Sequence, residues 1–211
     1  MEYLVTSLKK LTNKRWLVYI NYEPAFVLYI GELKRFDIKE DACISKAYYE
    51  DIKELLSKRA TVRAMSLLKS KDYTVQELKN KLEQGYYSNQ AVEHAIEYVS
   101  SYGYLNDERY AANYITFKAG SKSKRQIVGF LQQKGISQDI IERTCDEYYE
   151  ENSDAELTQI VTHMRKKLGR EPVEPDYETQ QKLMAYYYRK GFSSDNVRKA
   201  LDVVVNELFN N

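Results

Sequence analysis

The chain has 211 residues, enough for one large domain or for two or three small ones. Its 32 Lys and Arg nearly balance its 31 Asp and Glu, so a strongly basic nucleic-acid-binding protein is not indicated and any such role must come from local patches. Only 8 glycines and 3 prolines interrupt it, which is typical of a mostly helical protein, and no run of residues has the apolar length of a membrane span.

Residues 3–30 have the pattern of a small antiparallel sheet. Three short runs rich in β-branched and aromatic residues are separated by the turn-like sequences TNK and EP, and Pro24 favours a break between the second and third runs. Residues 31–45 resemble a connector, and Ser45 is expected to cap the helix that follows. No strand pattern follows residue 45.

The remaining sequence repeats a helix, a tight turn and a second helix. Three serines mark the register, and an apolar i, i+4 stripe stands on either side of each: Ser88, Ser137 and Ser193. A hydroxyl residue expected to cap the first helix lies 14 residues before each of them: Thr74, Ser123 and Thr179. Gly135 and Gly191 can end the first helix in a left-handed conformation, whereas in the first copy Gly85 falls one position early.

A further amphipathic stretch precedes each pair, beginning at residues 58, 106 and 155, so each repeat has three helices. The predicted fold is mainly α: an elongated array of three tandem three-helix repeats preceded by a small antiparallel β element. The predicted divisions are a β-rich extension (1–45), a linker helix with the first repeat (46–105), the second repeat (106–154) and the third repeat (155–211). Residues 170–178, with two prolines, are expected to form an exposed loop.

The stretch YGYLNDERYAANYI, residues 102–115, is either a catalytic cluster or the start of a helix. Asn106 can cap a helix in which Asp107 and Glu108 occupy the first turn, where negative charge meets the positive end of the helix dipole. Leu105 and Tyr110 have the spacing of a hydrophobic staple, and the tyrosines are explained by packing. The alternative is a metal or acid–base site, but no histidine or glycine-rich phosphate loop accompanies the stretch to support it.

The remaining chemistry-bearing residues give little sign of an enzyme. Cys43 and Cys145 lack the spacing of metal ligands, and His94 and His163 each stand alone. No nucleophile–base pair or Walker loop is recognisable, so we expect no catalysis, no metal and no cofactor. Because the N-terminus lacks a secretory signal pattern, we expect a cytoplasmic protein.

The sequence GYLNDERYA, followed by KAGSKSKRQIVGFLQQKGIS, resembles the signature of the RecX family of bacterial regulators of the recombinase RecA. The signature residues are Gly103, Tyr104, Leu105, Asn106, Asp107, Glu108, Arg109, Tyr110 and Ala111. The family usually has Asp at the position of Asn106 and often Gly and Pro near SKSK, so this chain departs at both places. The resemblance extends from about residue 58 to the end, and the β element looks like the N-terminal extension of some members.

The resemblance implies a non-enzymatic regulator in DNA repair and the SOS response. We expect the protein to be a monomer. RecX-like proteins bind RecA and the groove of its nucleoprotein filament, and inhibit its recombination, ATPase and coprotease activities. A row of repeats could touch several filament subunits at once, so that weak contacts combine. The alternative is a DNA-binding helical module that acts without RecA.

Local charge indicates where a partner could bind. Residues 106–134 hold six basic and two acidic residues, whereas residues 135–158 hold one basic and eight acidic residues. The candidate residues for RecA or weak direct DNA contact are Lys118, Lys122, Lys124, Arg125, Arg165, Lys166 and Lys167. A solvated helix face is the competing interpretation, and for residues 165–167 favourable charge at a helix C-terminus is another.

Overall fold

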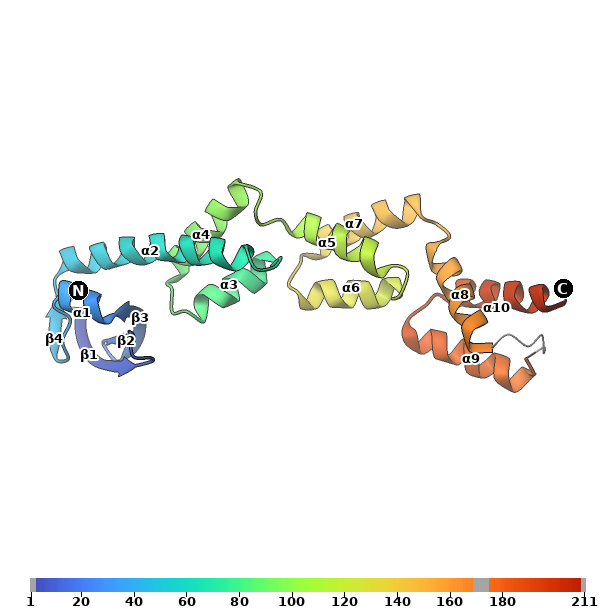
Figure 1. The fold of residues 1–211 in the computed structure, drawn as a ribbon, viewed down its shortest axis with the longest axis horizontal. Coiled ribbons are helices and arrows are strands. Elements are labelled where there is room, and N and C mark those ends of the chain that lie inside the picture. The colour runs from blue at the N-terminus through green and yellow to red at the C-terminus, as the bar shows by residue number, and fades with distance from the viewer. Residues whose placement is uncertain (1–2, 169–174, 210–211) are drawn as a thin grey trace. The chain divides into compact units, whose positions relative to one another are not determined.

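The computed structural model of the protein describes residues 3–168 and 175–209. The chain divides into two compact units, residues 1–106 and residues 107–211 (Figure 1). The first unit contains β1 (Tyr3–Lys10), β2 (Arg15–Ile20), β3 (Glu23–Tyr29), α1 (Ile30–Arg35), β4 (Ala42–Ile44), α2 (Lys46–Leu68), α3 (Val75–Glu83) and α4 (Asn89–Ser101). The second contains α5 (Asp107–Lys118), α6 (Lys124–Gln133), α7 (Gln138–Glu151), α8 (Ala155–Leu168), α9 (Tyr177–Lys190) and α10 (Ser194–Phe209). A mainly helical chain with repeated helix triplets and a small N-terminal sheet is confirmed.

The four strands form one antiparallel sheet in the order β3-β2-β1-β4. Asn21 and Tyr22 make the turn between β2 and β3, and their φ angles of 50° and 71° suit a two-residue hairpin. The predicted break at Pro24 is wrong, because Pro24 lies inside β3. Proline is tolerated there because β3 is an edge strand, where not every N–H needs a partner in the sheet.

The predicted connector at residues 31–45 is instead partly regular. It contains most of α1, which is six residues long, and β4, three residues long, which pairs with β1. The carboxylate of Glu32 holds α1 in place by accepting the Tyr29 backbone N–H at 2.7 Å and a hydrogen bond from the Arg59 guanidinium. Elements this short cannot display a hydrophobic period, so no sequence pattern indicates them.

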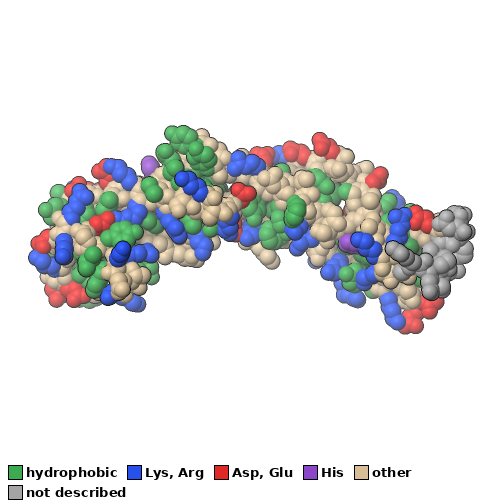
Figure 2. All heavy atoms as spheres, in the orientation of Figure 1, with side chains coloured by type: hydrophobic (Ala, Val, Ile, Leu, Met, Phe, Trp, Pro, Cys, Tyr) green, Lys and Arg blue, Asp and Glu red, His purple; other side chains and the backbone are tan. Residues whose placement is uncertain are grey.

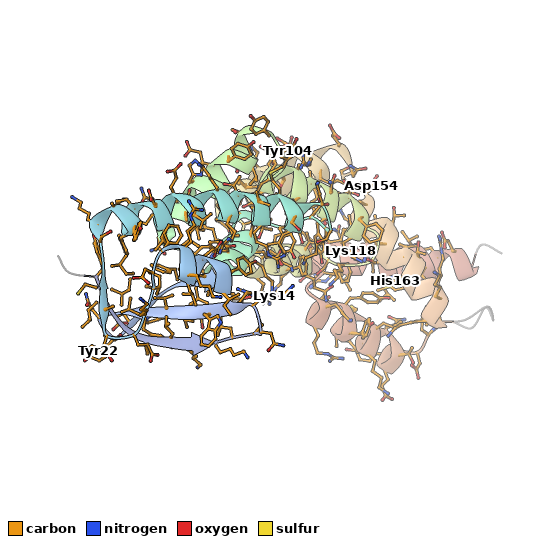
Figure 3. All side chains as sticks on the ribbon, turned by 60° about the vertical axis from the view of Figure 1, so that its left-hand side comes forward. Lys14, Tyr22, Tyr104, Lys118, Asp154 and His163 are labelled. Carbon is orange, nitrogen blue, oxygen red and sulfur yellow. The ribbon has the colours of Figure 1, made fainter. Side chains whose placement is uncertain are left out.

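The helix α2 is a single element of 23 residues that combines the predicted linker helix with the first helix of the first repeat. No glycine or proline interrupts it, and Ser45 caps it as predicted. Its first half buries Ile52 and Leu56 in the core under the sheet, and its second half buries Ala60 and Ala64 in the core shared with α3 and α4. Figure 3 shows α2 running along the sheet, so one helix joins the two cores of the first unit.

The predicted hydroxyl caps begin the paired helices with one exception. The side-chain oxygen accepts a backbone N–H three residues later at Thr74, Ser88, Ser123, Ser137 and Ser193. The prediction of Thr179 is wrong, because α9 begins at Tyr177 and Asp176 caps it by accepting the Thr179 N–H at 2.8 Å. Aspartate caps a helix as well as serine does, so the hydroxyl pattern alone does not reveal this cap.

The turns between paired helices contain a left-handed glycine in the second and third copies, as predicted. The first copy is built differently. Gly135 and Gly191 have φ angles of 77° and 86°. In the first copy Tyr86 takes the left-handed conformation itself, with φ 61°. A Cβ on Gly85 would lie 2.9 Å from the Tyr87 ring, so the early glycine leaves room for that ring. The predicted loop at 170–178 falls mostly on residues outside those described, and positions 177 and 178 belong to α9.

The described buried side chains form four separate clusters. One lies between the sheet and the first half of α2, and one lies within each helix triplet: α2–α4, α5–α7 and α8–α10. Each triplet therefore has its own apolar core, which is the arrangement expected of a repeat protein. The predicted boundaries at residues 45, 105 and 154 stay predictions.

The buried Tyr187 offers a first test of the third core. Its side chain is fully buried, and its hydroxyl has no hydrogen-bond partner among the described residues. Because an unsatisfied buried hydroxyl is unfavourable, we expect Tyr187→Phe to raise the free energy of unfolding by up to about 1 kcal/mol. Burial raises the pKa of Tyr187 from 10.0 to about 12, since the phenolate is poorly solvated there.

The pH dependence follows from that shift. The raised pKa in the folded chain means that the unfolded chain loses its proton first, so the wild type loses stability between about pH 10 and pH 12, and the phenylalanine variant loses less. Urea unfolding of both proteins across this range measures the difference. A variant less stable than the wild type at neutral pH would show that the hydroxyl has a partner.

Candidate functional site

The α6 N-terminus is fixed against the third helix triplet by Ser123. This serine is fully buried, caps α6 through the Gln126 N–H at 3.3 Å and donates its own hydroxyl proton to the carbonyl of Lys190 at 2.7 Å. One side chain thus serves as a helix cap and as a bond between triplets 67 residues apart in sequence. The cap was predictable from the sequence, whereas the bond to Lys190 was not.

Gly191 completes the same contact. A Cβ at this position would lie 3.0 Å from the Cβ and Cδ of Arg125 and 3.3 Å from the Ser123 hydroxyl oxygen. The Gln159 amide, oriented with its nitrogen toward Ala119, donates to the Ala119 carbonyl at 2.9 Å and accepts the Lys122 N–H at 3.0 Å. These bonds place the turn at residues 119–123 and the start of α6 beside α8 and the α9–α10 turn.

This close approach predicts a cost for Gly191→Ala. The substitution introduces a left-handed alanine and a steric contact, and we expect it to lower the free energy of unfolding of the α8–α10 triplet by at least about 1 kcal/mol. Gly103→Ala is the matched control, because Gly103 has φ 68° but nothing within 4 Å of a built Cβ. Urea denaturation of both variants separates backbone strain from the clash. Equal losses would mean that the contact with Arg125 is loose.

The structure gathers the first set of candidate basic residues at this junction. Lys118 ends α5, the Lys122 N–H bonds to the Lys118 carbonyl at 2.8 Å, and Lys124 and Arg125 open α6. Lys122 is partly exposed, and Lys124 and Arg125 are exposed. These four residues are called the junction cluster below.

Lys124 has a structural role that the sequence did not reveal. Its position at the start of a helix opposes the helix dipole, so the sequence alone offers no structural reason for a lysine there. In the fold its Nζ lies 3.2 Å from the Asp146 carboxylate of α7 and 5.3 Å from the Tyr149 ring centroid. The ion pair is exposed, so it contributes little to the free energy of unfolding. It is favourable, whereas the interaction of the Lys124 charge with the helix dipole is unfavourable.

The second candidate set, residues 165–167 of α8, is also partly engaged. Arg165 makes a two-pronged ion pair with Glu207 of α10, with contacts of 2.9 Å and 2.5 Å. The Nζ of Lys167 lies 3.3 Å from the Tyr186 ring centroid. Lys166 makes no ion pair with any described residue and lines a cavity of about 510 Å³ together with Gly120 of the 119–123 turn. Of this set, Lys166 is therefore the residue best placed to contact a partner.

The signature residues 103–111 have structural roles. Leu105 packs in the core of the first triplet and Ala111 in the core of the second. Asp107 and Glu108 occupy the first turn of α5 as predicted, and Glu108 forms an ion pair with Arg143 of α7 at 3.0 Å. Nothing in this geometry requires chemistry at the stretch.

The tyrosines near the signature correct one expectation. Packing in a core does not explain Tyr102 and Tyr104, because they are 61% and 55% exposed. They join Tyr98 in a row of rings whose successive centroids lie 5.0 Å and 6.0 Å apart. Figure 2 shows hydrophobic side chains gathered where α4 ends, and Figure 3 labels Tyr104 there. The sequence could not reveal this, because tyrosine suits both cores and surfaces.

Two other kinds of site are missing from the part of the chain that the structure describes. Residues 3–168 and 175–209 contain no group of His, Cys, Asp and Glu side chains that could hold a metal ion. Within the same residues, no helix has both the length and the apolar character needed to cross a membrane.

The fold and its junction cluster define a protein of tandem helix triplets with a small N-terminal sheet. Residues 106–144 match the RecX second three-helix domain, and residues 154–201 match the RecX third three-helix domain. The second and third helix triplets are thus similar to two successive domains of the RecX family.

Relatives along the whole length agree with this assignment. The regulatory protein RecX of Caldanaerobacter subterraneus is 29% identical, over 95% of this chain and 99% of its own. That of Bacillus subtilis is 26% identical, over 94% of this chain and 75% of its own.

Solved structures show the same fold. A crystal structure of regulatory protein RecX has a TM-score of 0.61 at 19% identity and covers 96% of this chain and 100% of that chain. RecX from Lactobacillus salivarius has a TM-score of 0.63 at 22% identity, over 71% of this chain and 96% of that chain.

Proposed function

We propose that the protein binds the recombinase RecA on its nucleoprotein filament and limits the recombination, ATPase and coprotease activities of RecA in DNA repair. The observation that carries the proposal is the match of two successive helix triplets to RecX domains. The protein acts by binding, without catalysis of its own.

Separately folded triplets suit a repeating partner. Each triplet has its own core, so each can present a contact surface without support from the next. A filament offers the same subunit surface many times, and contacts that are weak singly combine through effective concentration. Affinity for assembled filament therefore exceeds affinity for a single RecA subunit.

The junction cluster and Lys166 supply the positive charge for this contact. They come from two triplets of the second unit that the Ser123–Lys190 bond holds together. Their positive charge complements DNA phosphates or acidic protein surface in the filament. Arg165 and Lys167 flank Lys166 in the sequence and already have partners within the protein, Glu207 of α10 and the Tyr186 ring of α9.

The test measures ATP hydrolysis by RecA on single-stranded DNA as the purified protein is added. We expect the rate to fall with added protein, and co-sedimentation with RecA on the same DNA to depend on filament assembly. An unchanged rate at several-fold excess over filament sites would contradict the proposal. Intrinsic ATPase or nuclease activity would contradict the absence of catalysis.

A second candidate function is DNA binding without RecA, and the junction cluster is the observation that favours it. Binding to bare DNA would weaken steeply with salt, because each phosphate contact releases counterions. If binding to bare DNA is tight enough to account for all the inhibition, this second function replaces the first.

A further inference from the structure

The first unit contains a cavity of about 420 Å³ between the sheet and the first helix triplet. Its walls come from β2, β3, α2, α3 and the turn after α3. The residues that carry its chemistry are Arg15, Arg59, Arg63, Lys81, Tyr29 and Tyr87. This size is within the usual range of small-molecule sites and far exceeds the volume of a single phosphate group.

The charge of this cavity is largely uncompensated. Arg59 is paired with Glu32, and both side chains are 19% exposed. Neither Arg15 nor Arg63 forms an ion pair with a described residue, and Lys81 bonds only to the neutral Gln84 side chain, at 3.3 Å. Three cations therefore face one cavity without a counter-charge, an arrangement that an anion would stabilise.

The cavity is also organised before any ligand arrives. Besides its bond to Glu32, Arg59 donates to the Val27 carbonyl at 3.3 Å and lies 4.6 Å from the Tyr29 ring centroid. Arg15 and Tyr29 are direct partners across β2 and β3, and Arg63 follows Arg59 by one turn of α2. Since strands and a long helix carry these groups, little ordering is left to do on binding.

Tyr87 adds a neutral donor. Burial raises the pKa of Tyr87 above its ordinary value, although the nearby Arg59, Arg15 and Arg63 act in the opposite direction. The phenol therefore keeps its proton at neutral pH and can donate a hydrogen bond. Gly85 leaves the room that the Tyr87 ring occupies, since a Cβ there would lie 2.9 Å from it.

We propose that this cavity binds the phosphate groups of a nucleotide, either free or within single-stranded DNA. Guanidinium groups bond phosphate oxygens in pairs, and a diphosphate concentrates enough charge in a small volume to balance three cations. Tyrosine rings offer flat surfaces on which a base can stack, and Tyr29 is 42% exposed. A carboxylate side chain of a peptide brings one charge and no aromatic face, so it fits less well. The residues of this cavity lie in the first unit and share none with the junction cluster of the second unit.

The test uses the full-length protein without RecA, and isothermal titration calorimetry at low salt with three probes: ADP, an oligothymidylate and polyglutamate. We expect ADP or the oligothymidylate to bind more tightly than polyglutamate. Binding of ADP identifies a free nucleotide as the ligand, whereas binding of the oligothymidylate alone identifies DNA. The double variant Arg15→Gln, Arg63→Gln spares the Arg59–Glu32 pair and should weaken binding at least about tenfold.

The control is Lys9→Gln, Lys10→Gln, which removes the same charge from exposed positions of β1 outside the cavity and should change affinity less than about twofold. Lys81→Gln on α3 is a second test of the cavity, because it alters no strand or long-helix residue. Equal affinity of the double variant and the control for every probe would overturn the proposal. Failure of the wild type to bind ADP or the oligothymidylate, or preference for polyglutamate, would also overturn it.

Discussion

Replacing Leu131 with alanine is expected to lower the free energy of unfolding of the second triplet by about 2 to 5 kcal/mol. Leu131 lies on α6, is fully buried and shares a core with Ile127, Ile141 and Cys145. The truncation removes apolar contacts and leaves a cavity that a close-packed core refills only in part. The repeat register places Leu131 at this position, so the experiment tests the register as well.

The measurement must read the second triplet by itself, because the chain has several cores and need not unfold in one step. Hydrogen exchange of the α5–α7 amides provides this, since local opening free energies follow the stability of each cooperative unit. Gln133→Ala on the same helix is the control, because Gln133 is exposed and such changes usually stay within about 0.5 kcal/mol. Equal effects of the two substitutions would mean that the register is wrong.

The helix triplets could be predicted because their signals are local and periodic. A cap, an i, i+4 apolar stripe and a glycine turn recur at fixed offsets, as around Ser123, Leu131 and Gly135. The structure places a helix, a buried side chain and a positive φ angle at those positions. Each signal depends on neighbours within a few residues, so tertiary contacts did not override the predicted helices and turns.

The missed elements depend on contacts from far along the chain. The helix α1 is stabilised by Glu32, whose partner Arg59 lies 27 residues away, and β4 exists because β1 offers it an edge. Neither α1 nor β4 is long enough to show a period. Sequence patterns therefore found the repeat and missed the pieces that attach the sheet to it.

The sequence identified the basic residues of the candidate site, but it did not reveal which residues they contact. The junction cluster stands out as a run of positive charge, yet the partner of Lys124, Asp146, lies 22 residues away in an acidic helix. Similarly, Lys190 and Ser123 meet only because two triplets pack together. Charge counts show which residues are basic, but only the fold shows which of them already have partners.

Neutralising three members of the junction cluster, Lys122→Gln, Lys124→Gln and Arg125→Gln, is expected to weaken binding to the RecA filament by roughly tenfold to hundredfold. Exposed ionic interactions contribute up to about 1 kcal/mol each, and the effects of removing three of them multiply in the dissociation constant. Glutamine keeps most of the aliphatic stem, so the packing of Arg125 on the Gly191 turn is retained. Thermal unfolding should stay near the wild-type value, because the Lys124–Asp146 pair that the variant removes is exposed.

The salt dependence of the same variant identifies what the cluster touches. If it binds DNA phosphates, the slope of log affinity against log salt falls by about 0.7 for each phosphate that is no longer neutralised. If it binds acidic protein surface, affinity falls while the response to salt changes less, because a few screened ion pairs replace the counterion atmosphere of DNA. The triple variant Lys9→Gln, Lys10→Gln, Lys14→Gln removes equal charge from exposed positions of the first unit and separates a local effect from a net-charge effect. Equal inhibition of RecA by the wild type and both triple variants would move the binding surface elsewhere, and the exposed row of Tyr98, Tyr102 and Tyr104 would be the next to substitute.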